Sequence, residues 1–305
     1  MMFSSSSEKV KEILNRLMKP YKLLFKELER DKYVVKSVYE YFIEGKSASD
    51  KVNAILRIDV DSGLHLSLWL AYVLHYYGFN GSFYFLTFPE RYYNIWKSDV
   101  PKVVSDLGFE VGLHTDHYYQ QLIFGDDALE GIRRDIKRLS KLISKPIYGM
   151  VYHGHKSIDE LRTTNWEVYK YVSPEELGLK YHDGVYSPYT KPNSHDFWQP
   201  NTDHFLSDFL GVPGGWYYCA AYPIKVLRKA KPGESVHIVI HPLNVFSKWW
   251  IDWPDKYDEK MPESPTLSKH LYNFFKVRYA LGVKCLAKYP RIYHKLRRLK
   301  EWVKM

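Results

Sequence analysis

Five acidic or imidazole side chains in this sequence stand at the ends of short apolar runs. Carboxylates and imidazoles bind divalent cations, and they also transfer protons in catalysis. If the apolar runs are parallel strands, their carboxyl ends lie along one edge of a sheet, where catalytic residues of such folds gather. We therefore expect these side chains to meet in one site. The residues are Asp59, Asp61, His114, His153 and His241.

The first run, Asn53–Asp61, carries two carboxylates two residues apart. Strand side chains alternate between faces, so Arg57, Asp59 and Asp61 share one face of the strand. Two such carboxylates can converge on one divalent ion, or one can hold the ion while the other accepts a proton. For this strand alone, a polar outer face is an equal alternative. The apolar segment Leu64–Tyr77 that follows favours burial.

Histidines follow the later runs. His114 and His117 form an H-x-x-H pair, which lies on one face if the chain turns helical there. Two imidazoles with one carboxylate suit zinc with positions open for water. His241 ends an apolar run before Pro242, where an imidazole can act as a general acid. For each histidine alone, a structural role, in the core or as a capped strand end, is the alternative.

These residues belong to a regular alternation of expected strands and helices. Strands alternating with helices of this length indicate right-handed βαβ units and a parallel sheet. Residues 8–46 show helical periodicity instead, and residues 159–222 are irregular. The expected strands are 53–61, 82–88, 109–114, 147–152 and 236–240, and the expected helices are 64–77, 94–107, 127–143 and 224–229.

The charge of the chain is concentrated at its end. The net charge is +9, yet residues 266–305 hold eleven Lys or Arg against one acid, so the other 265 residues total −1. A basic tail on a neutral body argues against a nucleic-acid-binding domain. In the tail, Ile292, Leu296, Leu299 and Val303 form an apolar stripe among basic residues. This pattern suits a helix on an anionic membrane surface or, equally, a helix docked on the domain.

The remaining composition indicates a cytoplasmic protein. Cys219 and Cys285 are far apart, which gives no disulfide framework. The N-terminus lacks the apolar core of a signal peptide. The nearly uncharged stretch Gly63–Pro89 is long enough to span a bilayer, but Gly78 and Gly81 interrupt it, which favours a buried helix followed by a buried strand. We expect cytoplasmic localisation, and the membrane-surface interpretation of the tail adds peripheral contact at the inner membrane face.

Taken in order, four segments resemble the polysaccharide deacetylase superfamily (carbohydrate esterase family four, the NodB-homology domain), and more closely its D-V-D branch associated with surface-glycan biosynthesis. The resemblance spans roughly Asn53 to Asn244. It implies a distorted parallel (β/α)₇ barrel at residues 51–246, with an N-terminal helical extension at 1–50 and an aromatic loop and basic helices at 247–305. The segments are Arg57–Ser62, Phe109–Asp116, Gly178–Asp183 and Val239–Asn244.

The resemblance also implies roles for the residues. Asp59 is the expected general base, Asp61 and His114 bind a divalent metal expected to be zinc, and His241 protonates the departing amine. The family has adjacent aspartates, whereas Val60 intervenes here. The family spaces its second histidine by four, where this sequence has Tyr118, so the third ligand is His117 or, alternatively, His153.

The function expected from this resemblance is metal-dependent removal of an N-acetyl or O-acetyl group from a sugar or glycan precursor. One alternative is a nucleotide-sugar glycosyltransferase that uses Asp59 and Asp61 as its D-x-D motif, in which case the histidines would share no site. A second alternative is an inactive barrel that binds glycans.

Overall fold

The computed structural model describes residues 6–45, 47–61, 63–87, 94–154, 165–183, 202–208 and 221–246. The expected aromatic loop and basic C-terminal helices, at residues 247–305, lie outside this part of the chain. Much of the irregular stretch expected at residues 159–222 lies outside it as well.

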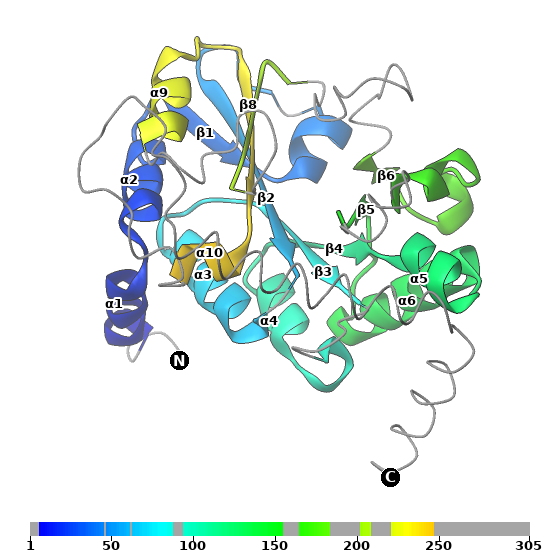
Figure 1. Cartoon of the computed structure of the whole chain (residues 1–305). Helices are drawn as coiled ribbons and strands as arrows, with labels where there is room; N and C mark the ends of the chain where they lie inside the picture. Colours follow the sequence, from blue (N-terminus) through cyan, green and yellow to red (C-terminus); the bar gives the residue numbers. More distant parts are fainter. Residues whose placement is uncertain are drawn as a thin grey trace, which may run out of the picture.

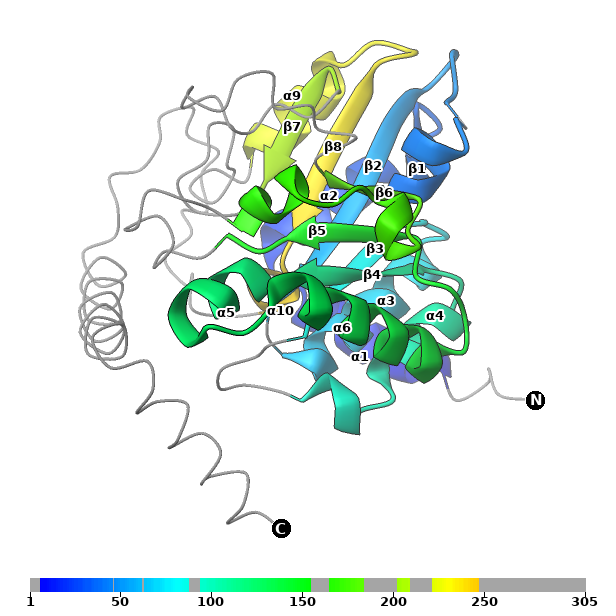
Figure 2. The same ribbon diagram turned by 90° about the vertical axis from the view of Figure 1, so that its right-hand side faces the viewer.

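A parallel sheet forms the centre of the molecule, in the order β6-β5-β4-β3-β2-β8-β7, with β1 paired to β2. Every described strand pairing is parallel, and the sheet is curled, so that β4 and β5 run across the direction of β2 and β8 in Figure 2. This curled sheet confirms the predicted distorted parallel (β/α)₇ barrel. The strands are β1 (Tyr33–Lys36), β2 (Val52–Val60), β3 (Ser82–Leu86), β4 (Glu110–Thr115), β5 (Gly149–Tyr152), β6 (Tyr181–His182), β7 (His204–Ser207) and β8 (Ser235–Ile240).

The two faces of the sheet bury different side chains. On β2, Leu56 and Ile58 are fully buried in the main core, against the helices. Ile55 faces the other way and packs with Tyr84 and Tyr181 in a small second cluster. Because β2 alternates, Arg57 and Asp59 lie on the same face as Ile55. The polar residues of β2 therefore point to the concave side of the curled sheet.

Helices connect the strands and cover the outer face of the sheet (Figure 1). Helix α3 begins after Gly63, whose left-handed φ of 68° lets the chain turn from the end of β2. In α6, Asp127 accepts a hydrogen bond from the Glu130 amide at 2.9 Å and so caps the first turn. The helices are α1 (Ser6–Arg16), α2 (Lys19–Leu28), α3 (Leu64–Tyr76), α4 (Val100–Asp106), α5 (His117–Phe124), α6 (Ala128–Ile143), α9 (Ala221–Lys229), α10 (Pro242–Phe246), and the short turns η1 (Tyr39–Ile43), η2 (Ile95–Lys97), η3 (Asn165–Lys170) and η4 (Glu175–Leu177).

The N-terminal extension is only partly helical. Helices α1 and α2 are present as predicted, but Tyr33–Lys36 forms strand β1. The β-branched Val34 and Val35 favour a strand, and β1 lies alongside the first half of β2, on the edge that β3 takes further along. The following turn, η1, packs against the small second cluster. The extension therefore contributes to the sheet itself.

The stretch Gly63–Pro89 contains the predicted helix and strand, α3 and β3. Ser67, Leu70 and Leu74 of α3 are buried, which explains why this helix carries so little charge. Within the described residues, no helix has both the length and the apolar character needed to cross a membrane.

Candidate metal centre

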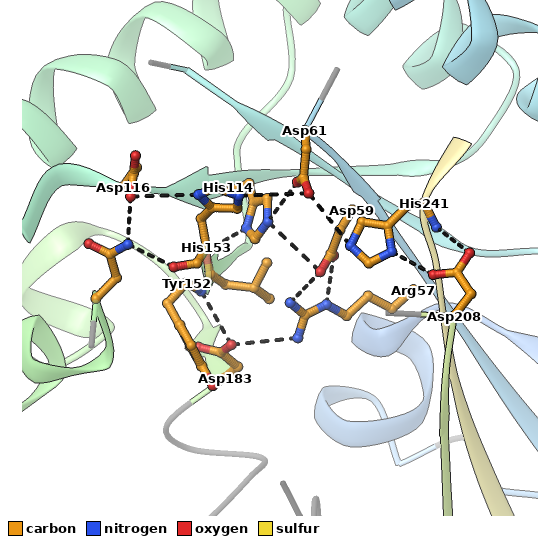
Figure 3. Close-up of polar contacts among 12 residues, drawn as sticks. Arg57, Asp59, Asp61, His114, Asp116, Tyr152, His153, Asp183, Asp208 and His241 are labelled. Atoms are coloured by element: carbon orange, nitrogen blue, oxygen red, sulfur yellow. Dashed lines mark hydrogen bonds and ion pairs between the residues drawn. The ribbon is translucent and has the colours of Figure 1, made fainter. Parts of the chain in front are cut away.

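Four strands bring acids and imidazoles to one edge of the sheet, as the sequence predicts (Figure 3). Asp61 follows β2, His153 follows β5 and His241 follows β8, while His114 is the second-last residue of β4. Because β2 is hydrogen-bonded to β3 and β8, and β4 to β3 and β5, these ends lie side by side. The side chains are distant in sequence, yet they face one another across the mouth of the curled sheet.

Asp61, His114 and His153 form a group that can hold a metal ion. One ligand atom from each lies within 4.8 Å of the others. Nε2 of His114 is 3.1 Å from Oδ1 of Asp61, and Nε2 of His153 is 3.7 Å from Oδ2. Tetrahedral bonds of about 2.0–2.2 Å separate ligand atoms by roughly 3.3–3.6 Å, so this spacing suits a cation. Buried Oδ1 of Asp61 also accepts no hydrogen bond from the described residues.

The tautomer of His114 leaves a lone pair for this group. Its Nδ1 is 3.2 Å from the carbonyl oxygen of Val151, which can only accept a hydrogen bond. Nδ1 therefore carries the proton, and Nε2, facing Asp61, has the lone pair that a metal requires. The ring is 2% exposed, so it is held in this orientation by packing as well.

Opposite charges dominate the electrostatics between Asp61 and His153. Burial disfavours the carboxylate of Asp61, but the imidazoles of His153 and His241 outweigh it and hold its pKa well below the ordinary range. Burial likewise disfavours the charged form of His153, yet Asp61 and Asp116 raise the pKa of that imidazole well above its usual value. The pocket thus stabilises positive charge next to Asp61, as a cation site must.

The structure does not bring His117, the first choice for the third ligand, to this group. Its Nε2 is 3.2 Å from Oδ2 of Asp135 on α6, and its Nδ1 is 3.0 Å from Oγ1 of Thr115. Both ring nitrogens are thus occupied by contacts away from Asp61. Helix α5 begins at His117 and turns the ring towards α6, so the spacing in H-x-x-H does not produce a shared site. The alternative ligand, His153, takes its place.

Asp59 lies beside the candidate ligands and is held by Arg57. Two guanidinium nitrogens of Arg57 donate to the two carboxylate oxygens of Asp59, each at 2.7 Å. Burial disfavours the charged carboxylate, but the guanidinium of Arg57 outweighs it and lowers the pKa of Asp59 below its ordinary value. Oδ2 of Asp59 is 3.8 Å from Nε2 of His114. Arg57 therefore fixes an ionised Asp59 at the edge of the group.

Arg57 also lies close to a second carboxylate, that of Asp183. Asp183, directly after β6, has Oδ2 at 3.5 Å from Nη1 of Arg57, and it accepts a hydrogen bond from the amide of Tyr152 at 3.2 Å. Burial raises the pKa of Asp183 to about 6, and Arg57 opposes that rise only in part. Arg57 is thus the cation between two carboxylates from different strands.

His241 is held by a partner that the sequence analysis did not identify, Asp208. Oδ1 of Asp208 is 2.5 Å from Nδ1 of His241, and Oδ2 accepts the His241 amide at 2.9 Å. Nε2 of His241 remains directed at Asp61, 3.6 Å from Oδ2. Burial disfavours the imidazolium, but Asp208 outweighs it and raises the pKa of His241 to about 9. The geometry gives His241 a fixed orientation and a proton to donate.

A further residue reaches this pair from the N-terminal extension. The hydroxyl of Tyr21, on α2, donates to Oδ2 of Asp208 at 2.7 Å. Asp208 also follows a strand, β7, so the rule that found the other acids applies to it. Tyr21 carries no such signal, because it lies on the buried face of α2 with Leu24 and Phe25.

No protein-family model matches the sequence, and no curated protein matches it. Among solved structures, the chain is similar to a pseudoenzyme of the carbohydrate esterase family four (CE4) from Bacillus anthracis, at 16% identity and a TM-score of 0.35, over 62% of this chain and 54% of that chain. A mutant of that pseudoenzyme with restored enzymatic activity gives 15% identity and a TM-score of 0.36, over 62% and 56%. A polysaccharide deacetylase from Bacillus cereus gives 17% identity and a TM-score of 0.38, over 65% and 83%.

These similar structures belong to the family that the sequence motifs resemble. The chain spans little more than half the length of the pseudoenzyme chains that it matches.

Proposed function

We propose that this chain is a divalent-metal-dependent hydrolase that removes an acetyl group from a sugar or glycan precursor. One observation supports the proposal above all others: Asp61, His114 and His153, from three strand ends, place their ligand atoms within 4.8 Å of one another. Asp59 and His241 both lie beside this group. A carboxylate and an imidazole beside a two-histidine, one-carboxylate metal site are the groups that hydrolysis of an amide or ester requires.

The proposed ligands are Asp61, His114 and His153, and zinc suits this donor set best. A divalent cation, when bound, polarises the acetyl carbonyl and lowers the pKa of a water molecule. Asp59 accepts the proton of the attacking water as general base, and Arg57 keeps its carboxylate oriented. The new bond joins the water oxygen to the acetyl carbon.

His241 completes the reaction as general acid. Asp208 holds Nδ1, which leaves the Nε2 proton directed into the site. As the carbon–nitrogen bond of an acetamide breaks, Nε2 gives its proton to the departing amine, and acetate and a free amino sugar result. An O-acetyl substrate would follow the same course and release an alcohol.

The position of the histidines disfavours the glycosyltransferase alternative. A D-x-D motif that binds a nucleotide sugar through manganese makes no use of His114, His153 and His241. Instead, Nε2 of each of these imidazoles lies 3.1–3.7 Å from a carboxylate oxygen of Asp61. A glycan-binding barrel without activity differs from the proposed enzyme in turnover, so the test below separates the two.

The test pairs metal content with product formation. The purified chain is stripped with a chelator, titrated with Zn²⁺, Co²⁺ or Mn²⁺, and then assayed for acetate release from N-acetylated and O-acetylated amino sugars and their oligomers. We expect one metal equivalent and metal-dependent acetate release. A chain that binds none of these ions contradicts the proposed centre, whereas stoichiometric metal without acetate from any substrate favours the binding module.

We also propose that the enzyme is cytoplasmic and touches the inner membrane face through its basic tail. The apolar stripe and surrounding Lys and Arg residues after Tyr289 support this, by sequence alone. Deletion of residues 290–305 should weaken co-sedimentation with liposomes that contain anionic lipid. Equal sedimentation of the full chain and the truncated chain would assign the tail a structural role.

A further inference from the structure

Two buried polar residues beside His153 have no part in the proposed reaction. Asp116, directly after β4, is 3% exposed, and Asn165, at the start of η3, is 1% exposed. They are 49 residues apart in sequence, yet Nδ2 of Asn165 donates to Oδ1 of Asp116 at 2.6 Å. A buried acid and a buried amide must have polar partners, because burying unpaired polar groups costs stability, and here those partners include the candidate ligand His153.

Asn165 uses its whole amide to join the ends of β4 and β5. Its Nδ2 carries two hydrogens and also donates to the backbone oxygen of His153 at 2.7 Å. Its Oδ1 accepts the amide of Tyr119, on α5, at 2.8 Å. A third connection runs from the His153 amide to the Thr115 oxygen at 2.8 Å. The backbone of His153 is therefore fixed relative to the end of β4.

Asp116 acts on the ring of the same histidine (Figure 3). Its Oδ1, already bonded to Asn165, lies 3.6 Å from Nδ1 of His153, while Nε2 on the opposite side of the ring faces Asp61. A carboxylate opposite Nδ1 favours the tautomer with its proton there. The lone pair of Nε2 then points at Asp61 and at the centre of the candidate metal site.

We infer that Asp116 and Asn165 are positioning residues that make His153 the third ligand. This inference rests on the proposed metal centre and extends it. Asn165 fixes the backbone of His153, and Asp116 fixes the ring and its tautomer. Partners that orient a metal-binding histidine commonly contribute about 10–100-fold to metal affinity. The family pattern takes its second histidine ligand from the segment of His114 and none from the end of β5. The contacts of Asp116 and Asn165 explain how His153, at the end of β5, can supply that ligand instead.

The test measures metal affinity directly, with no substrate. Zn²⁺ affinity is determined by competition with a chromophoric chelator, and the visible spectrum of bound Co²⁺ reports the ligand set. We expect Asn165→Ala and Asp116→Asn each to weaken Zn²⁺ binding by about 10–100-fold and to change the Co²⁺ spectrum. Asp116→Asn keeps the shape of the side chain, so it tests the inference even if Asn165→Ala folds poorly.

Asn53→Ala is the matched control. Asn53 is also fully buried, and its amide bonds to Ala48. It lies eight residues before Asp61, at about 3.3 Å per residue some 26 Å from the site. The control should lose stability, as seen in urea unfolding, and keep the Zn²⁺ affinity of the wild type within about threefold.

The same substitution in a chain that already lacks the His153 ring distinguishes loss of His153 positioning from general destabilisation of the segment around Asn165. In a His153→Ala chain, Asn165→Ala should weaken Zn²⁺ binding by less than about threefold, because the residue that it positions is gone. An equal loss in both backgrounds, or unchanged affinity in the single variants, overturns the inference and leaves the proposed centre standing. Absence of metal binding by the wild type instead overturns the centre itself.

Discussion

His117 and His153 offer a comparison within one molecule. Each is a histidine that follows a strand, and each has an aspartate near its ring: Asp135 for His117 and Asp116 for His153. The partners of the second ring nitrogen differ. For His117 that partner is the hydroxyl of Thr115, whereas for His153 it is Asp61, a member of the candidate metal group.

The difference lies in what the second ring nitrogen faces: that of His153, and not that of His117, faces the candidate metal group. The ring of His117 fits over Gly131 of α6, where an added Cβ would lie 2.5 Å from Cδ2 of His117. His117 thus joins α6 to the end of β4, as part of the packing. His153 is also a histidine with an aspartate beside its ring, but that ring points into the concave side of the curled sheet. Four predictions test this division of roles, and the first has the largest expected effect.

Asp61→Ala combined with His114→Ala should abolish metal binding and leave the fold intact. The two side chains supply the shortest contact of the candidate group, 3.1 Å, and neither belongs to the main core. Elemental analysis of the dialysed double variant checks the metal, and circular dichroism checks the fold. Stoichiometric metal in this variant would remove the site and with it the comparison of the two histidines.

Asp59→Asn should keep the metal and reduce acetate release by about 10²–10⁴-fold, the usual contribution of a general base. The amide keeps the shape of the side chain but accepts no proton. Metal content and turnover are measured on the same sample. Unchanged acetate release would show that Asp59 is a structural partner of Arg57, in the way that Asp135 is of His117.

His153→Ala should weaken Zn²⁺ binding by more than about 100-fold, since loss of a ligand exceeds the effect of losing a positioning partner. His117→Ala should leave the affinity within about threefold. Chelator competition on both variants is the measurement. If the two effects are reversed, the H-x-x-H pair of the sequence is the metal motif, and the arrangement described here is not the functional one.

His117→Ala should instead lower the free energy of unfolding by about 1–3 kcal/mol, because buried Asp135 loses a hydrogen-bond partner. Burial disfavours ionised Asp135, but His117 outweighs it and lowers the pKa of that carboxyl. A carboxyl with a lowered folded pKa stabilises the fold above its ordinary pKa of about 3.9, and that contribution is lost as the pH falls through the folded value. The deficit of the variant should therefore be full at pH 7 and shrink below about pH 4.

Urea unfolding of the wild type and the His117→Ala variant, at pH 7 and below about pH 4, checks this prediction. A deficit that stays the same in acid would indicate lost packing around Gly131 rather than a lost hydrogen bond to ionised Asp135. Asn53→Ala serves again as the control, because its amide contacts involve no titrating group.

Local patterns predicted much of the fold. The apolar runs that predicted β2, β3, β4, β5 and β8 form buried strands of the sheet. The apolar stretch before Gly78 and the periodic stretch before Pro146 form the predicted helices α3 and α6. Strands β6 and β7 were not predicted, because both lie within residues 159–222, where the sequence shows no regular alternation of strands and helices, and β6 has only two residues. Strand β1 escaped because Tyr33–Lys36 continues directly from a helical pattern.

The sequence by itself determined which residues could do chemistry and at which strand ends they stand, because strand alternation and the edge of a parallel sheet follow from local backbone geometry. Tertiary structure decided the rest. It chose His153 over His117, paired His241 with Asp208 and Arg57 with Asp59 and Asp183, and brought Tyr21 to Asp208 from 187 residues away. These choices depend on where rings and carboxylates from separate segments point once the sheet curls, and no local spacing encodes that.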